Sequence, residues 1–236
     1  MATKGKLYLI PAPLGENAAH TLPQYVIDIL HRLDVFIAER AKTARRFIKE
    51  TNPSKPFSEL AFYEITKHTP PEERARFLED AEQGKDIGLL SEAGCPGVAD
   101  PGAFVVQTAH QRGIQVVPLV GPSSILLALM ASGLNGQDFC FHGYLPPRRP
   151  ELDRELKFLE QRVFKHQQTQ IFIETPYRNM GLVETAVNVL SPDMLFCIAA
   201  DLTLPTEYVR TLAVRDWRKE QVPDLHKHPA VFLVGR

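Results

Sequence analysis

Residues 87–102 read IGLLSEAGCPGVADPG, four apolar residues followed by a segment rich in Gly, Pro and acidic side chains. A short apolar run bounded by such turn residues predicts a buried strand of a parallel sheet. Asp100 and Pro101 then have the form of a helix N-cap and a first helical residue, and Gly113 is expected to end that helix. Ligands of parallel sheets bind beyond the carboxyl ends of the strands. Segment 91–102 is therefore the first place to look for a functional site.

The same alternation of short apolar runs and helical segments extends to both sides, which predicts an α/β fold built on parallel strands. Two helices are expected to begin with capping boxes at Thr21 and Thr69. The proline-rich segment 145–150 is the expected linker between two α/β domains, residues 1–142 and 143–236. The predicted strands are 6–10, 35–38, 60–65, 87–90, 115–119, 139–144, 170–173, 194–199, 208–214 and 230–234, and the predicted helices are 21–31, 43–50, 69–83, 100–113, 125–131, 151–165 and 180–190.

The composition is that of an ordinary globular protein. Of 236 residues, 44% are hydrophobic and 23% charged, which excludes a disordered or fibrous chain. The 27 Lys and Arg balance 28 Asp and Glu to a net charge of −1, and no polybasic arm is present. Tight non-specific nucleic-acid binding is therefore not expected, although a structured RNA can still be recognised by a local basic patch.

The cysteines and the hydrophobic runs predict a cytoplasmic protein that does not enter a membrane. Cys95, Cys140 and Cys197 are odd in number, far apart and without a C-x-x-C pair, which argues against a disulfide framework, a zinc ribbon or a dithiol redox site. The apolar run before Pro11 is too short for a signal peptide, and residues 125–131 are too few to span a bilayer.

Four loops that directly follow predicted strands carry the candidate chemistry: 11–15, 91–102, 121–124 and 174–178. The glycine spacing in the second loop does not fit a dinucleotide fingerprint, and no phosphate-cradling G-K-[ST] sequence occurs. The chain also lacks a G-x-S-x-G elbow and an H-E-x-x-H metal motif. Hydride transfer, nucleotide hydrolysis and metal-dependent hydrolysis thus lose their usual signals.

Together and in this order, these loops resemble the tetrapyrrole-methylase superfamily of S-adenosylmethionine-dependent methyltransferases. Within the superfamily the chain is most similar to the branch that methylates a cytidine ribose 2′-hydroxyl of small-subunit ribosomal RNA. The resemblance implies two α/β domains with a cofactor cleft between them, a homodimer, and ribosomal RNA or the small ribosomal subunit as partner, with no metal. The matching segments are LYLIPAPLG (7–15), FIAERAKTARRFI (36–48), LLSEAGCPGVADPG (89–102), VVPLVGPSSILLALMASGL (116–134), FHGYLP (141–146), FIETPYRN (172–179) and PAVFLVGR (229–236).

Carried onto this chain, the resemblance also implies a set of cofactor-binding residues. Backbone groups of glycine-rich loops can bond the adenine and the methionine carboxylate, and small side chains leave room for a bent ligand. The implied residues are Pro13, Leu14, Glu92, Ala93, Gly94, Cys95, Val98, Ala99, Ser123, Ser124, Ile173, Glu174, Ala200 and Asp201.

A ribose hydroxyl has to lose a proton during methylation, so a general base would help. The candidates for that base, or for orienting the substrate, are Glu39, Asp100, Glu174 and Tyr177. Each carboxylate has an ordinary structural alternative, because Asp100 can cap a helix, Glu174 can hold Arg178, and Glu39 can pair within a basic helix. The sequence leaves the choice among them open.

Departures from the branch leave the methyl acceptor open. The branch reads AEDTR where this chain has AERAK (38–42), and Tyr177 replaces a histidine. Ala200 and Leu204 replace two basic residues. Methylation of a tetrapyrrole or other small molecule, and a cofactor-binding paralogue without transferase activity, therefore remain alternatives. The candidates for a phosphate-reading face are Arg45, Arg46, Arg148, Arg149 and Arg178, with a solvated helix surface as the equal alternative for Arg45 and Arg46.

Overall fold

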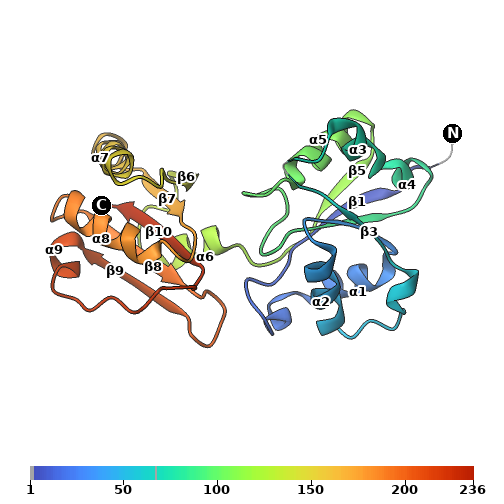
Figure 1. The fold of residues 1–236 in the computed structure, drawn as a ribbon, viewed down its shortest axis with the longest axis horizontal. Helices are drawn as coiled ribbons and strands as arrows, with labels where there is room; N and C mark the ends of the chain where they lie inside the picture. Colours follow the sequence, from blue (N-terminus) through green and yellow to red (C-terminus); the bar gives the residue numbers. More distant parts are fainter. Residues whose placement is uncertain (1–2, 67) are drawn as a thin grey trace. The chain divides into compact units, whose positions relative to one another are not determined.

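A computed structural model describes residues 3–66 and 68–236 and divides the chain into two compact units, Met1–Ser123 and Ser124–Arg236 (Figure 1). Each unit is a sheet with its own helices and its own hydrophobic core. The α/β fold class expected from the sequence is confirmed.

The first unit is a parallel sheet in the order β3-β2-β4-β1-β5. Its central strands are buried on both faces, as a parallel sheet requires. The strands are β1 (Lys6–Ile10), β2 (Val35–Ala38), β3 (Ala61–Glu64), β4 (Ile87–Leu90) and β5 (Gln115–Pro118), and the helices are α1 (Gln24–Arg32), α2 (Ala41–Glu50), α3 (Pro71–Arg76), α4 (Glu79–Glu82) and α5 (Gly102–Gln111), with 3-10 turns at Ala19–Thr21 and Phe57–Glu59.

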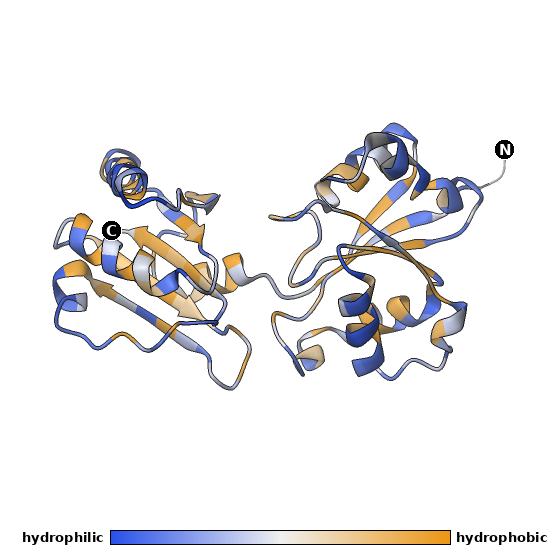
Figure 2. Ribbon diagram, in the orientation of Figure 1, coloured by the Kyte–Doolittle hydropathy of each residue, from blue (hydrophilic) through white to orange (hydrophobic). Residues whose placement is uncertain are grey.

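Successive side chains along each strand enter two different cores, because the side chains of a strand alternate between the faces of a sheet. On one face Tyr8 and Phe36 pack with residues of α1 and α2. On the other face Leu7 and Ile37 pack with residues of α4 and α5. The apolar colouring of these strands, against the mixed colouring of the helices, is visible in Figure 2. The two-sided cover leaves the ends of the strands as the places where a ligand can approach.

The second unit is a mixed sheet in the order β6-β7-β10-β8-β9, in which the β6 and β7 pair is parallel and the other pairs are antiparallel. Its centre is a stack of Phe172, Phe232 and Phe196, with ring centroids 6.0 Å apart in each neighbouring pair. The strands are β6 (Phe139–Tyr144), β7 (Thr169–Ile173), β8 (Leu195–Ala200), β9 (Tyr208–Ala213) and β10 (Ala230–Gly235), and the helices are α6 (Ser124–Ser132), α7 (Arg149–His166), α8 (Asn179–Val189) and α9 (Val214–Trp217).

The predicted strands are confirmed to within a residue or two at their ends, whereas several helix starts were predicted wrongly. α1 has Pro23 at its N-cap, because Thr21 lies in a 3-10 turn and its hydroxyl donates to Ala18 O at 2.7 Å. The helix predicted over 69–83 is instead the two short helices α3 and α4, and the Thr69 hydroxyl accepts from the Thr66 N–H. The hydroxyl groups of Thr21 and Thr69 thus form hydrogen bonds within turns and do not cap helices as predicted.

The compact units also divide earlier than the boundary predicted after His142. α6 packs against β8, β9 and β10, and β6 pairs with β7, so residues 124–142 belong to the second unit. The segment 145–150 is likewise not a linker, because Leu145 is buried in the core of the second unit and α7 begins at Arg149.

Gly121 is predicted to be indispensable for the close approach of the loops after β1 and β5. A Cβ at this position would lie 2.3 Å from Pro11 Cβ and 2.6 Å from its Cγ, and a proline ring cannot rotate away. We expect Gly121→Ala to lower the free energy of unfolding by about 1–3 kcal/mol, measured by urea denaturation. The matched control is Gly136→Ala, where no atom lies within 4 Å of the added carbon. Equal stability of the two variants would contradict the prediction.

Candidate functional site

Two backbone hydrogen bonds tie the loop after β1 to the loop after β4. The Ala12 N–H donates to Gly94 O at 2.9 Å, and the Gly94 N–H donates to Ala12 O at 3.0 Å. The Ser91 hydroxyl also donates to Gly94 O, at 2.8 Å. These bonds bring Pro13 and Leu14 beside Glu92, Ala93 and Gly94, as expected of candidates for one binding site.

The loop after β4 has a backbone that few sequences can adopt. Gly94 and Gly97 have φ of +71° and +82°, and Ala99 has φ of +59°, a region that residues with a side chain rarely occupy. The Asp100 carboxylate fixes this path, because its Oδ1 accepts from the N–H groups of Gly97 and Gly102 at 2.8 Å each. Asp100 thus bonds the start of α5 from one position before the N-cap, which is Pro101.

The loop after β5 joins the same group through Cys95, whose thiol donates to Pro122 O at 3.5 Å. Burial raises the pKa of Cys95 above its ordinary value, so the thiol stays protonated at neutral pH. Cys95 thus packs within this loop and bonds it to the loop after β5.

Glu39, Glu92 and Asp100 form an acidic cluster at the carboxyl ends of β2 and β4. The strands run parallel with Ala38 opposite Leu90, so the residues that follow them meet at one edge. The pKa of Glu39 is raised, first by burial and then by the negative charges of Asp100 and Glu92, while the Glu92 N–H and Arg40 oppose the shift. Burial also raises the pKa of Asp100. A carboxylate with a raised pKa is a better proton acceptor than an ordinary one.

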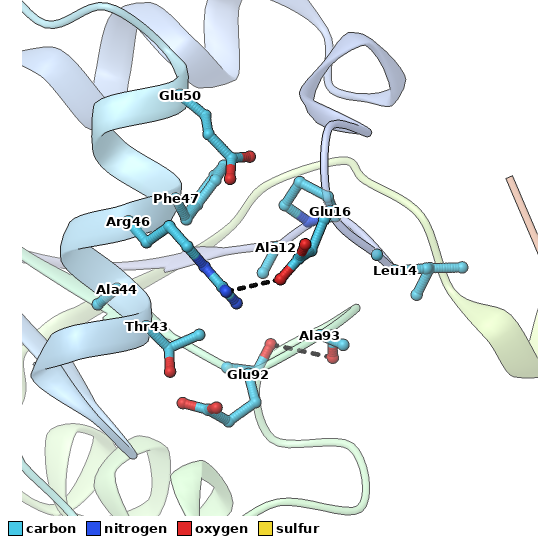
Figure 3. A pocket seen from close by; sticks show the side chains of 13 residues that line it. Ala12, Leu14, Glu16, Thr43, Ala44, Arg46, Phe47, Glu50, Glu92 and Ala93 are labelled. Atoms are coloured by element: carbon cyan, nitrogen blue, oxygen red, sulfur yellow. Dashed lines mark hydrogen bonds and ion pairs between the residues drawn. The ribbon is translucent and has the colours of Figure 1, made fainter. Parts of the chain in front are cut away.

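A hollow of about 110 Å³ opens beside this cluster, between α2 and the loops after β1 and β4 (Figure 3). On the side of α2 it is lined by Thr43, Phe47 and Glu50, which the helix places on one face. Arg46 and Glu16 form an ion pair of 2.7 Å beside it. The residues of this wall were not among those predicted from the sequence, although the 43, 47, 50 spacing places them on one face of a helix.

The candidates of the second unit gather at one edge of its sheet. β7 and β8 flank β10 on opposite sides, and Val231 pairs with both Ile173 and Ala199. Both strands are antiparallel to β10, so their carboxyl ends point the same way and place Ile173 near Ala200.

Glu174 and Asp201 are committed to partners within the second unit. Glu174 Oε1 accepts from Arg178 Nη2 at 2.6 Å and from the Thr175 N–H at 2.5 Å, and its side chain is 2% exposed. Asp201 Oδ2 accepts from the Thr206 hydroxyl at 2.6 Å and lies 2.6 Å from His228 Nδ1. Neither contact of Asp201 was predicted from the sequence; Thr206 lies five residues further along the chain, in the turn after β8, and His228 lies 27 residues away.

The four candidates for a catalytic base stand in different surroundings. Asp100 and Glu174 are held by hydrogen bonds that shape their loops, whereas Tyr177 is 70% exposed and meets His226 edge to face, with ring centroids 5.5 Å apart. Glu39 belongs to the acidic cluster beside the hollow. Ser123 and Ser124 lie at the end of the first unit and the start of α6.

The residues that the structure describes contain neither a metal-binding cluster nor a membrane-spanning helix. No group of three His, Cys, Asp or Glu side chains there is arranged to hold a metal ion. No helix in the described ranges is long and apolar enough to cross a membrane.

The chain is an α/β protein with glycine-rich loops at the carboxyl ends of its parallel strands, where proteins of this class bind small ligands. The chain belongs to the tetrapyrrole (corrin/porphyrin) methylase family, whose sequence pattern matches residues 6–216. It is therefore a methyltransferase by family.

Comparison with individual proteins agrees with this assignment. The chain is 29% identical over 221 residues to the ribosomal RNA small subunit methyltransferase I of Escherichia coli O157:H7, covering 92% of this chain and 73% of that one. The methyltransferase CobJ shares the fold with a TM-score of 0.63 at 19% identity, covering 98% and 94% of the two chains. A uroporphyrin-III C-methyltransferase of Thermus thermophilus, solved with S-adenosylhomocysteine, has a TM-score of 0.55 at 16% identity and 98% coverage of both.

We predict that Asp100 acts chiefly through its two backbone hydrogen bonds. Asp100→Ala leaves the N–H groups of Gly97 and Gly102 without this acceptor, so we expect a loss of about 1–3 kcal/mol in the free energy of unfolding. Asp100→Asn keeps an acceptor oxygen and should retain most of the stability. Urea denaturation of both variants measures the difference, and an Asn variant as unstable as the Ala variant would refute this role.

Proposed function

We propose that this protein transfers the methyl group of S-adenosylmethionine to a ribose 2′-hydroxyl of small-subunit ribosomal RNA. The observation that carries the proposal is the joined set of loops beside the acidic cluster, in a chain whose curated relative is named a ribosomal RNA small subunit methyltransferase. In this proposal the loops bind the cofactor, and a carboxylate of the cluster accepts the proton that the hydroxyl must lose.

The residues of the first unit fit the cofactor in their chemistry. Gly94 packs against Leu14 and Pro122 O, which would lie 3.4 and 3.6 Å from a Cβ at this position, and its φ of +71° lets the loop follow a path that a residue with a side chain rarely adopts. Exposed backbone groups of the loop can bond an adenine or a carboxylate, and the nearby carboxylates favour a positively charged sulfonium. When bound, S-adenosylmethionine supplies an activated methyl group, and the protein mainly aligns it with the acceptor.

Glu39 is the residue that we assign as the general base. Its carboxylate is partly buried, and the neighbouring charges of Asp100 and Glu92 favour uptake of a proton. Asp100 and Glu174 are already engaged by bonds that hold their loops. Glu39 would accept the proton of the ribose hydroxyl as that oxygen takes up the methyl group, and bound S-adenosylmethionine would supply that group with its sulfur as the leaving atom.

We also propose that the protein acts as a homodimer in the cytoplasm. The homodimer rests on the family resemblance, and the compartment rests on the free thiols of Cys95, Cys140 and Cys197. The residues of the second unit implied for the cofactor (Ser124, Ile173, Glu174, Ala200 and Asp201) stay predictions.

Calorimetric titration with S-adenosylmethionine and S-adenosylhomocysteine is the experiment that tests the cofactor. We expect binding of both at micromolar strength, followed by transfer of a labelled methyl group to unmethylated small ribosomal subunits. Transfer to a tetrapyrrole instead would replace the acceptor but keep the enzyme class. Binding without transfer to any component of a cell extract would favour a paralogue that has lost catalysis, and no binding of either compound would refute the proposal.

Replacing Glu39 tests the assignment of the base. We expect Glu39→Gln to lower kcat by about 100-fold to 10,000-fold with cofactor affinity retained, because a missing general base slows only the chemical step. Since the folded state raises the pKa of Glu39, its charge destabilises the fold as pH rises through that pKa. Glu39→Gln should therefore melt at a higher temperature than the wild type at neutral pH, with the difference vanishing toward pH 4.

Glu92→Gln is the matched variant for this test. Removing the Glu92 charge lowers the pKa of Glu39, so the acid limb of the kcat profile should move to lower pH without the loss seen in Glu39→Gln. An unmoved acid limb in Glu92→Gln, or full kcat in Glu39→Gln, would show that another group takes the proton.

A further inference from the structure

The exposed side of α2 concentrates positive charge in a protein that is nearly neutral overall. The helix buries Ala44, Phe47 and Ile48 against the sheet, and its other side faces solvent. Five of the 27 Lys and Arg of the chain lie between residues 40 and 50, and all five side chains are exposed: Arg40, Lys42, Arg45, Arg46 and Lys49.

Helical spacing gathers these charges into one stripe. Lys42, Arg45 and Lys49 stand at i, i+3 and i+7, so they lie on one face, with Arg46 beside them. From Lys42 to Lys49 the helix rises by about 10 Å, a length over which one strand of a nucleic-acid helix presents about three phosphates.

Little of this charge is neutralised within the protein. Among residues 3–66 and 68–236, no carboxylate forms an ion pair with Lys42, Arg45 or Lys49, and Arg45 lies over the ring of Phe62 at 4.7 Å. Arg46 pairs with Glu16, but their side chains are 57% and 71% exposed. Exposed ion pairs contribute little to stability, so a phosphate can displace Glu16 at small cost.

The stripe runs alongside the hollow, because Arg46 belongs to both. The same helix turns Thr43, Phe47 and Glu50 toward the hollow, opposite Glu92 on the loop after β4 (Figure 3). A polyanion bound along the stripe would thus pass the mouth of the hollow and the acidic cluster behind it.

We propose that the Lys42–Arg45–Arg46–Lys49 stripe of α2 binds the phosphate backbone of the acceptor RNA and brings one nucleotide to the hollow. This inference rests on the proposed RNA methylation and names the surface that it uses. Arginine binds phosphate through paired hydrogen bonds and lysine as a point charge, and neither reads a base from such a position. The stripe therefore supplies affinity and register, and it does not supply sequence preference.

Neutralising the stripe tests the proposal. The probe is an unmethylated transcript of small-subunit ribosomal RNA, and the variant combines Lys42→Gln, Arg45→Gln and Lys49→Gln. We expect RNA affinity near 0.1 M salt to fall about tenfold or more, and the slope of log K against log salt to become shallower by about 2, with S-adenosylmethionine binding and melting temperature close to wild type.

The control removes the same charge elsewhere, through Lys6→Gln, Lys165→Gln and Lys219→Gln. These side chains are exposed, and Lys6 stands at the amino end of β1, the opposite end of the sheet from the hollow. A second variant, Lys42→Arg, Arg45→Lys and Lys49→Arg, keeps the charge and should keep the affinity and the salt slope.

The outcomes separate this proposal from the proposed function. A wild-type protein that binds the transcript through the stripe but transfers no methyl group to it would support the surface and refute the function. A wild-type protein that methylates the RNA, with the neutralised variant indistinguishable from the control, would overturn the surface and leave the function standing. Loss of affinity in the charge-conserving variant, or no binding of the transcript by the wild type, would also overturn the surface.

Discussion

The exchange of two backbone hydrogen bonds between Ala12 and Gly94 is the constraint on which the candidate site depends. β1 and β4 are neighbours in the sheet, and this short bridge continues their contact past the carboxyl ends of the strands. Without it, the two loops would be free to separate as independent turns. With it, Leu14, Gly94 and Glu92 belong to one small framework, and the left-handed backbone of the second loop has a fixed partner.

The acidic cluster lowers the stability of the first unit. Burial disfavours the charged forms of Glu39 and Asp100, and at Glu39 the negative charges of Asp100 and Glu92 add to the effect. Asp100 offsets its share through bonds to Gly97 and Gly102, whereas Glu39 has one N–H and a nearby arginine in compensation. A carboxylate that destabilises the fold and lies beside a hollow is typical of a functional group.

Much of the fold was predictable because its signals are local. The run Ile87–Leu90 is apolar and bounded by turn residues, and it forms the predicted central strand. The capping prediction at Thr21 failed because a hydroxyl has several nearby partners, and the choice between them depends on how the preceding turn packs. The boundary between the units depends on packing as well. That α6 packs on the second sheet follows from contacts with distant strands, which the local sequence does not predict.

The site was predictable only in part, for a related reason. The loops were found because ligands approach parallel strands at their carboxyl ends, but the neighbours of Glu39 depend on the register that sets Ala38 opposite Leu90. The contact of His228 with Asp201 joins positions 27 apart in sequence, and no local pattern in either segment predicts that they meet.

The strand order determines when each strand can find its partners during synthesis on the ribosome. β1 is made first, yet it lies between β4 and β5, which are synthesised some 80 and 110 residues later. In the second sheet β10 lies between β7 and β8 and pairs with both. These two strands are therefore not joined into one sheet until β10 has been made. Each sheet thus waits for distant partners, and closing such long loops is slow. During synthesis the backbone N–H and C=O groups along an edge of β1, and later along an edge of β7 and of β8, therefore stay without their sheet partner until the neighbouring strand has been made.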